Sequence, residues 1–256
     1  MGVELRTSSS YSAPMARRAQ QDHGFWPYLV PMAIFLLLAS FGDRFPESMA
    51  PWVFIAKVLL PGGLLLYFAL KGRYPELSGW KPTPGIIAGD VAVGLLGTVI
   101  WCGPFLLFPT LRPDEPGFDP EQFGASLVGA TLAVRAIGYA VVTPYVEELF
   151  VRSWLLRYIE VVSTRKDFRK VPIGHFAWPA FVITTAYFVF SHVPWEWGVM
   201  LLWTLLTMAW LYHRKHIMSL VLVHAVTNGS ILAFAIVGSG RVHDVEGTLV
   251  NLWFFV

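Results

Sequence analysis

The sequence predicts an all-α fold, a polytopic bundle of seven or eight transmembrane helices with a polar site inside the membrane. Of the 256 residues, 55% are hydrophobic and only 14% are charged, which is too apolar a composition for an ordinary soluble domain. The apolar residues form runs of the length needed to cross a bilayer as helices. The 11 Trp and 19 Phe residues suit aromatic belts at the two membrane interfaces.

The chain divides into a short polar tail and one membrane domain. Residues 1–24 are polar and lack the apolar core of a cleaved signal peptide, so we expect a flexible cytoplasmic tail. Residues 25–256 make up the membrane domain. Its expected crossings are residues 26–41, 52–70, 86–108, 121–162, 178–192, 198–212 and 217–237. Residues 249–256 are apolar but few, and we expect them to add at most a marginal eighth helix.

The expected crossings are separated by segments rich in Pro, Gly and charged residues, such as GDRFPES and RPDEPGFDPEQ. The stretch 121–162 is longer than one crossing requires. We interpret it as a single crossing bent at Pro144, with residues 121–136 partly at the outer interface. A division into two crossings would place the basic loop 157–172 outside the cell, against the positive-inside rule.

The distribution of basic residues predicts the orientation of the bundle. Most Lys and Arg residues lie in the tail and in alternate loops, namely at positions 6, 17, 18, 71, 73, 81, 157, 165, 166, 169, 170, 214 and 215. The intervening loops carry only Arg44, Arg112 and Arg241. The N-terminus of this integral, multi-pass protein is therefore expected in the cytoplasm.

The net charge of +2 does not indicate a nucleic-acid partner, because the basic residues are spread over many short loops rather than gathered on one face. The partner that the composition does indicate is the lipid bilayer. No pattern in the sequence indicates an oligomeric state.

Several ionisable and amide side chains interrupt the apolar runs. The most conspicuous stretch is PYVEELFVR, residues 144–152, with two adjacent glutamates. The full set within the expected crossings is Lys57, Asp90, Arg135, Glu147, Glu148, Arg152, His192, His224 and Asn228. Such groups are costly in hydrocarbon and persist mainly where pairing or function compensates them. We interpret Lys57 as a snorkelling residue and Arg135 as an interfacial one, and we assign no catalysis to these two or to Asp90.

Spacing places most of these groups on defined helix faces. Glu148 and Arg152 are four residues apart, so they share a face and can form an ion pair. Phe188 and His192 have the same spacing, as do His224 and Asn228. At 1.5 Å per residue these polar groups lie about 16–22 Å from one end of their helices, so they can meet at one level.

The residue types in this set suit hydrolysis. A carboxylate in a low-dielectric site can take a proton from water, and a neighbouring imidazole can orient that water or protonate a leaving amine. A second His and an Asn can donate hydrogen bonds to the oxyanion of a tetrahedral intermediate. Two His and a Glu could instead hold Zn²⁺ with one open position, although the His-Glu-x-x-His signature is absent from the sequence.

Three motifs resemble those of a known family. EELFVR (Glu147, Glu148, Arg152), FVFSH (Phe188, His192) and HAVTN (His224, Asn228) occur in the order found in the CPBP family. This family, also called Abi, comprises CAAX-protease and bacteriocin-processing intramembrane proteases. The resemblance covers about residues 140–230. The chain has Val151-Arg152-Ser153 where the family often has Phe-Arg-Gly.

The resemblance implies an intramembrane endopeptidase that acts on a membrane-anchored protein or peptide. It implies Glu147 as the residue that activates water, His192 and His224 as the motif histidines and Asn228 as the closing amide. Glu148, Arg152 and Phe188 then support the site. We favour a glutamate mechanism without a cofactor, and a zinc-dependent form of the same protease is the first alternative. A transporter, or a non-catalytic scaffold or immunity protein with the same polar cluster, is the second.

Overall fold

The computed structural model describes residues 24–256, and the regular structure in that range is helical, without β-strands. The predicted tail therefore lies outside the described residues, apart from Gly24. The α-helices are α1 (Trp26–Phe41), α2 (Ala50–Leu70), α3 (Pro84–Leu107), α4 (Val128–Ile137), α5 (Thr143–Glu147), α6 (Leu156–Val161), α7 (Trp178–Phe190), α8 (Trp197–Arg214) and α9 (Ile217–Gly238). Two π-helical segments, Gly138–Val142 and Glu148–Leu155, join α4 to α5 and α5 to α6.

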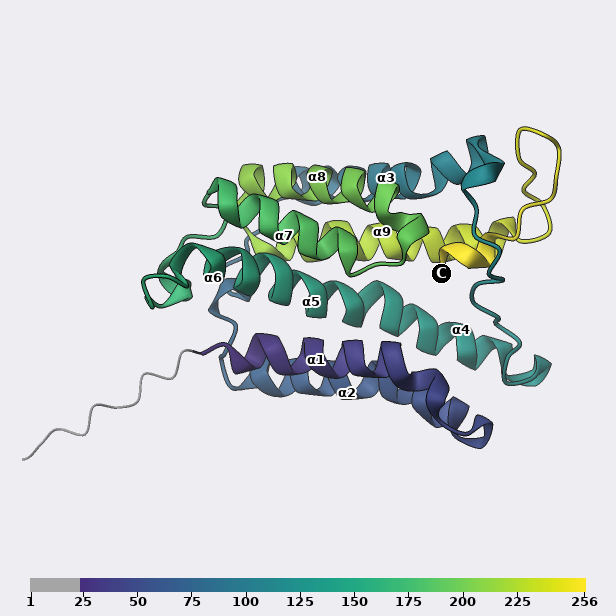
Figure 1. The fold of residues 1–256 in the computed structure, drawn as a ribbon, viewed down its shortest axis with the longest axis horizontal. Coiled ribbons are helices and arrows are strands. Elements are labelled where there is room, and N and C mark those ends of the chain that lie inside the picture. The colour runs from purple at the N-terminus through teal and green to yellow at the C-terminus, as the bar shows by residue number, and fades with distance from the viewer. Residues whose placement is uncertain (1–23) are drawn as a thin grey trace, which may run out of the picture.

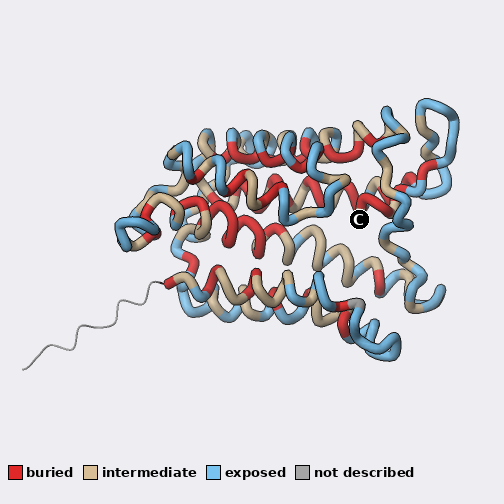
Figure 2. Tube along the Cα trace, in the orientation of Figure 1, coloured by how far each residue is buried: buried red, intermediate tan, exposed pale blue. Residues whose placement is uncertain are grey.

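The helices run along one common direction (Figure 1). α1 and α2 pack against each other as a pair on one side. α4, α5 and α6 with their π-helical joints form one long rod in the middle, spanning Ala125–Val161. α3, α7, α8 and α9 form the other side, where α3 and α9 pack closely together. Buried residues concentrate in the second half of the rod and in α9, whereas most residues of α1 and α2 are intermediate or exposed (Figure 2).

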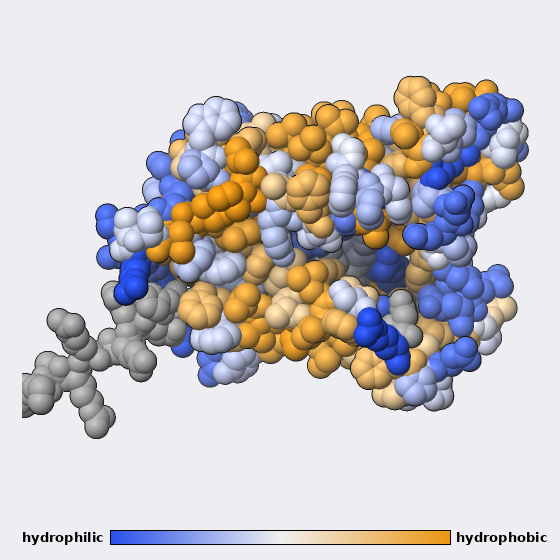
Figure 3. All heavy atoms as spheres, viewed as in Figure 1, coloured by the Kyte–Doolittle hydropathy of each residue, from blue (hydrophilic) through white to orange (hydrophobic). Residues whose placement is uncertain are grey.

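The surface of the bundle is suited to lipid. Four helices are long and apolar enough to cross a membrane, namely Glu47–Leu70, Pro84–Leu107, Ala125–Val161 and Ile217–Gly238. Only 17% of the most apolar window of the first is buried within the protein, so its apolar side chains need another cover. Hydrophilic side chains gather at the two ends of the molecule (Figure 3). These features point to an integral membrane protein.

The structure corrects two of the expected crossings. α7 ends at Phe190 and not at residue 192, because Ser191 and His192 turn away and Pro194 follows. Residues 249–256 do not form an eighth helix. They contain one 3₁₀ turn, Leu252–Phe255, whose Phe255 ring packs 5.8 Å from that of Phe105.

Without the eighth helix, seven crossings stay a prediction, because α1 and α7 are short apolar helices and α8 is not among the four candidates. The stretch 121–162 does form a single continuous helix from Ala125 to Val161. Pro144 opens α5 directly after a π-helical segment, so the helix is not interrupted there. The loops that carry most of the basic residues lie at one end of the bundle, where Arg157 pairs with Glu76 at 3.5 Å. Which end faces the cytoplasm stays a prediction.

α3 and α9 approach closely at Gly94, and this contact sets the position of the α9 side chains. A Cβ atom at Gly94 would lie 2.6 Å from Cβ of Val226 and 2.8 Å from the carbonyl oxygen of Val223. The hydroxyl of Thr227 also donates a hydrogen bond to the carbonyl oxygen of Gly94 at 2.9 Å. Only a residue without a side chain fits this position, since one of the opposing atoms belongs to the backbone.

We therefore predict that Gly94→Ala destabilises the protein by about 1–3 kcal/mol, because α9 must move to admit the methyl group. Gly103→Ala is the matched control in the same helix, because a Cβ there would meet no atom within 4 Å. That control should be neutral or stabilising by up to about 1 kcal/mol. Unfolding of both variants in detergent tests this, and equal stability of the two would contradict the close packing.

Candidate active site

A cavity of about 750 Å³ lies between the α1–α2 pair, the long central helix and the layer of α7, α8 and α9. Its mouth is visible as a hollow in Figure 3. All four residues assigned to catalysis from the sequence line this one cavity, namely Glu147, His192, His224 and Asn228. Phe188 lines it as well, while Glu148 and Arg152 lie behind the wall.

Glu148 is fully buried and is the centre of a polar network behind the cavity. Its Oε1 accepts hydrogen bonds from Arg152 Nη1 at 3.4 Å and from His224 Nδ1 at 2.9 Å. The expected ion pair between Glu148 and Arg152 is therefore present. It forms within a π-helical segment rather than in the α-helix that we expected from the sequence. Such segments are frequent at functional sites.

Arg152 is held by more than its ion pair. Its guanidinium carbon lies 3.9 Å from the centre of the Phe188 ring, and Nη2 donates to Thr207 Oγ1 at 3.2 Å. The family-motif residue Phe188 thus acts as a stacking surface for the arginine. Through these contacts Arg152 joins the central helix to α7 and α8.

His224 lies between the two glutamates. While Nδ1 donates to Glu148, Nε2 is 3.9 Å from Glu147 Oε2. The imidazole also packs against Trp203, with the ring centres 4.7 Å apart. Glu148 therefore fixes the orientation of the ring, and the ring presents its other nitrogen to Glu147.

His192 lies in the turn after α7, where one hydrogen bond holds its side chain and another holds its backbone. Its Nδ1 donates to the carbonyl oxygen of Phe188 at 2.8 Å, and Trp197 Nε1 donates to the carbonyl oxygen of His192 at 2.9 Å. Phe188 and His192 are thus joined by a hydrogen bond from the His192 side chain to the Phe188 backbone. They do not share one helix face, although the spacing predicts that they would. Because Nδ1 is used, Nε2 is the nitrogen left for the cavity.

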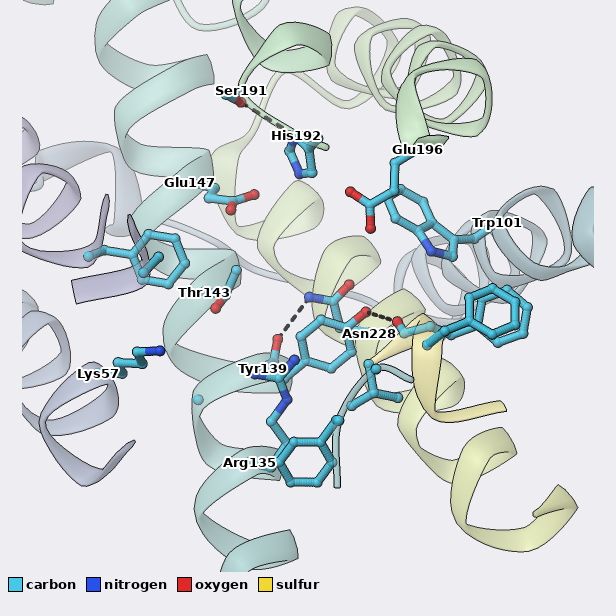
Figure 4. A pocket seen from close by; sticks show the side chains of 18 of the residues that line it. Lys57, Trp101, Arg135, Tyr139, Thr143, Glu147, Ser191, His192, Glu196 and Asn228 are labelled. Atoms are coloured by element: carbon cyan, nitrogen blue, oxygen red, sulfur yellow. Dashed lines mark hydrogen bonds between the residues drawn. The ribbon is translucent and has the colours of Figure 1, made fainter. Parts of the chain in front are cut away.

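Asn228 is positioned by one missing backbone hydrogen bond in the otherwise continuous central helix. In the π-helical segment the Thr143 N–H donates to Gly138, so the carbonyl oxygen of Tyr139 would pair with residue 144. That residue is proline and has no N–H. The carbonyl oxygen of Tyr139 instead accepts a hydrogen bond from Asn228 Nδ2 at 2.8 Å (Figure 4). One N–H of the Asn228 amide is thereby used, and the other stays available.

Glu196 is a cavity residue that our sequence analysis did not identify. It lies in the short turn Pro194–Glu196 between α7 and α8, outside the expected crossings from which we took candidates. In Figure 4 its carboxylate points to the same part of the cavity as the carboxylate of Glu147 and the imidazole of His192. Burial, and next the neighbouring Glu147 charge, raise the pKa of Glu196 to about 7. The only sequence signal was an acidic residue between two tryptophans, four positions after a motif histidine.

The remaining ionisable residues divide between the cavity and the packing. Lys57 and Arg135, which we interpreted as snorkelling and interfacial, both line the cavity. Asp90 lies elsewhere and is fully buried. It accepts a hydrogen bond from Trp210 at 2.9 Å and pairs with Arg214 at 3.3 Å, so it ties α3 to α8.

Among residues 24–256, no three His, Cys, Asp or Glu side chains are grouped so that they could hold a metal ion. One ring nitrogen of each motif histidine is held by a hydrogen bond, that of His192 by a backbone carbonyl and that of His224 by Glu148. Such bonds orient the imidazole ring and leave its other nitrogen for a proton, a substrate or a metal ion.

The apolar helices, with a cavity between them that polar side chains line, point to an integral membrane protein. Residues 129–230 match the family model described as type II CAAX prenyl endopeptidase Rce1-like. This match includes all three motifs and agrees with the family resemblance that they indicated, and it supports a CAAX-type intramembrane endopeptidase. Proteins of that family act on membrane-associated protein substrates. The search of curated proteins and the search of solved structures found no match.

We predict that Arg152→Met destabilises the protein by about 3–5 kcal/mol, because it leaves the buried Glu148 carboxylate without its cation. The double variant with Glu148→Gln should be more stable than Arg152→Met alone, since no buried charge then lacks a partner. Arg241→Met, at an exposed arginine, is the control. An Arg152→Met protein that melts in detergent at the wild-type temperature would show that the pair is not structural.

A second prediction concerns pH. Because the pKa of Glu196 is about 7 in the folded protein and 4.5 ordinarily, the folded state binds an extra proton between these values. The free energy of unfolding should therefore fall by roughly 3 kcal/mol from pH 5 to pH 8 on account of this group. Glu196→Gln should remove that part of the dependence. Denaturant unfolding of both proteins at the two pH values tests this, and parallel pH profiles would refute it.

Proposed function

We propose that the protein is an intramembrane endopeptidase that hydrolyses a peptide bond of a membrane-anchored protein or peptide. The observation that carries this proposal is the gathering of a carboxylate, two imidazoles and an amide around one cavity in an apolar bundle. The family match supports the same reaction class. A transport pathway would call for polar groups along the whole bundle, and the clustering around one cavity favours hydrolysis.

In the proposed reaction, a water molecule donates one hydrogen bond to Glu147 and the other to Nε2 of His192. Both groups are acceptors in this arrangement, since Nδ1 of His192 carries the proton given to Phe188. Glu147 takes a proton from the water as its oxygen attacks the scissile carbonyl carbon. When the C–N bond breaks, Glu147 returns that proton to the leaving amine.

The oxyanion of the tetrahedral intermediate is stabilised by Asn228 and His224 in this proposal. Asn228 supplies the N–H that Tyr139 does not occupy. His224 can donate through Nε2 while Nδ1 donates to Glu148 only if the ring carries both protons. Glu148 and Arg152 act by holding His224 and have no contact with the substrate.

We predict that Glu147→Gln lowers kcat by at least about 10²-fold while substrate binding is retained, because an amide cannot accept the proton. Glu121→Gln is the matched control, since it removes an exposed carboxylate outside the cavity. The readout is the membrane-fraction peptidome of cells expressing each protein, followed by turnover of an identified substrate in detergent. Full turnover by Glu147→Gln would eliminate the proposed base.

Metal analysis of the same preparations distinguishes the zinc-dependent alternative from the metal-free mechanism. If Glu147 acts without a metal, chelation should leave turnover unchanged and no zinc should track with activity. Stoichiometric zinc that is lost on chelation together with activity, and that restores activity when added back, would overturn the metal-free mechanism. A non-catalytic scaffold would show no substrate that accumulates in the Glu147→Gln cells.

A further inference from the structure

Arg135 projects into the cavity from α4 and is clamped between two aromatic rings. Its guanidinium carbon lies 5.0 Å from the centre of the Tyr139 ring and 5.2 Å from that of Phe118. Both rings are themselves held in place. The Tyr139 hydroxyl donates to the carbonyl oxygen of Phe255 at 3.2 Å, and the Phe118 N–H donates to that of Trp253 at 3.0 Å.

The guanidinium has stacking partners but no anionic one. Its Nε is buried and lacks a hydrogen-bond partner within the described chain. Two carboxylates line the cavity from the nearby loop, Glu115 and Asp119, yet among residues 24–256 none forms an ion pair with Arg135. This contrasts with the buried arginines Arg152 and Arg157, which each have a glutamate partner. A fixed guanidinium with free donors is the group that proteins use to bind a carboxylate in a bidentate manner.

We propose that Arg135 binds the C-terminal carboxylate of the substrate and so directs cleavage to the end of the chain. The proposal rests on the proposed function, because it takes the peptide in the cavity to be the substrate. Figure 4 shows Arg135 and Glu147 on the same helix, at opposite ends of the cavity.

The helix between the two residues fixes where the cut falls. Arg135 and Glu147 are twelve positions apart, or about 18 Å along a helix at 1.5 Å per residue. An extended peptide covers about 3.3–3.6 Å per residue, so this length corresponds to no more than about five residues. Both side chains reach inward and shorten the path. A carboxylate held by Arg135 thus places the bond a few residues before the C-terminus next to Glu147.

The test measures binding, so that it does not depend on turnover. The probe is a ten-residue peptide with an N-terminal acyl chain and a fluorophore, made with either a C-terminal carboxylate or a carboxamide. Its affinity for the full-length Glu147→Gln protein is measured by fluorescence anisotropy in detergent. We expect the carboxylate form to bind about 10-fold more tightly than the carboxamide, as for a hydrogen bond to a charged group.

Adding Arg135→Gln should abolish this difference, and Arg135→Lys should restore part of it, because the charge returns without the planar fork. Arg241→Gln, at an exposed arginine, should keep the full difference. Equal affinity for the two peptides, including no measurable binding of either, overturns the proposal. So does a preference that survives Arg135→Gln in a protein that elutes and melts normally.

Turnover then separates this proposal from the proposed function. If the wild-type protein cleaves both peptides equally well and binds them equally, the endopeptidase stands and the carboxylate site fails. If the carboxylate preference depends on Arg135 but neither peptide is cleaved by wild type, the site stands and the assignment as a protease loses its support.

Discussion

The structure depends on the compensation of one buried negative charge. Glu148 has no access to solvent, and an uncompensated carboxylate in such a place would be intolerable in an apolar bundle. Arg152 neutralises it and His224 donates to it. Because these partners come from the central helix and from α9, the same charge that must be neutralised also holds two helices in register.

The cavity can be regarded as the product of that network. Arg152 stacks on Phe188 and donates to Thr207, so α7 and α8 are fixed to the same centre. His224 is turned by Glu148 toward Glu147, and His192 is turned by the carbonyl of Phe188. His224, His192 and Asn228 are thus each oriented by a hydrogen bond that leaves another polar atom of the side chain for the cavity. Such preorganisation is what a hydrolytic site requires, because reorientation during the reaction would raise the barrier.

Much of this could be predicted from the sequence, for identifiable reasons. The helical segments follow from runs of apolar residues, which is why the bounds of α1 and α9 agree with expectation to within one residue. The pairing of Glu148 with Arg152 follows from a local spacing. Positions that depend on distant contacts were missed. Glu196 enters the cavity because the turn after α7 folds inward, and no local pattern encodes that turn. Residues 249–256 are as apolar as a membrane crossing, yet they do not form one and instead pack against aromatic side chains of the bundle.

The positions of Lys57 and Arg135 in the cavity also could not be predicted from local sequence patterns. Lys57 and Arg135 looked like residues that reach the membrane surface, because sequence position alone gives depth but not direction. Only the packing of α2 and α4 around a common space turns both inward.

The π-helical segments of the central helix have a consequence for the comparison of related sequences. The hydrogen-bonded ring of a π-helical turn contains one residue more than that of an α-helical turn. A relative that lacks one residue within Gly138–Val142 could therefore keep the same helix axis with an ordinary α-helical turn. In such a chain a proline at the position of Pro144 would still offer no N–H to that carbonyl, and the two ends of the rod would differ in rotation about their axis. An aligned gap inside this helix, normally a sign of a misplaced alignment, would here mark a real difference in architecture.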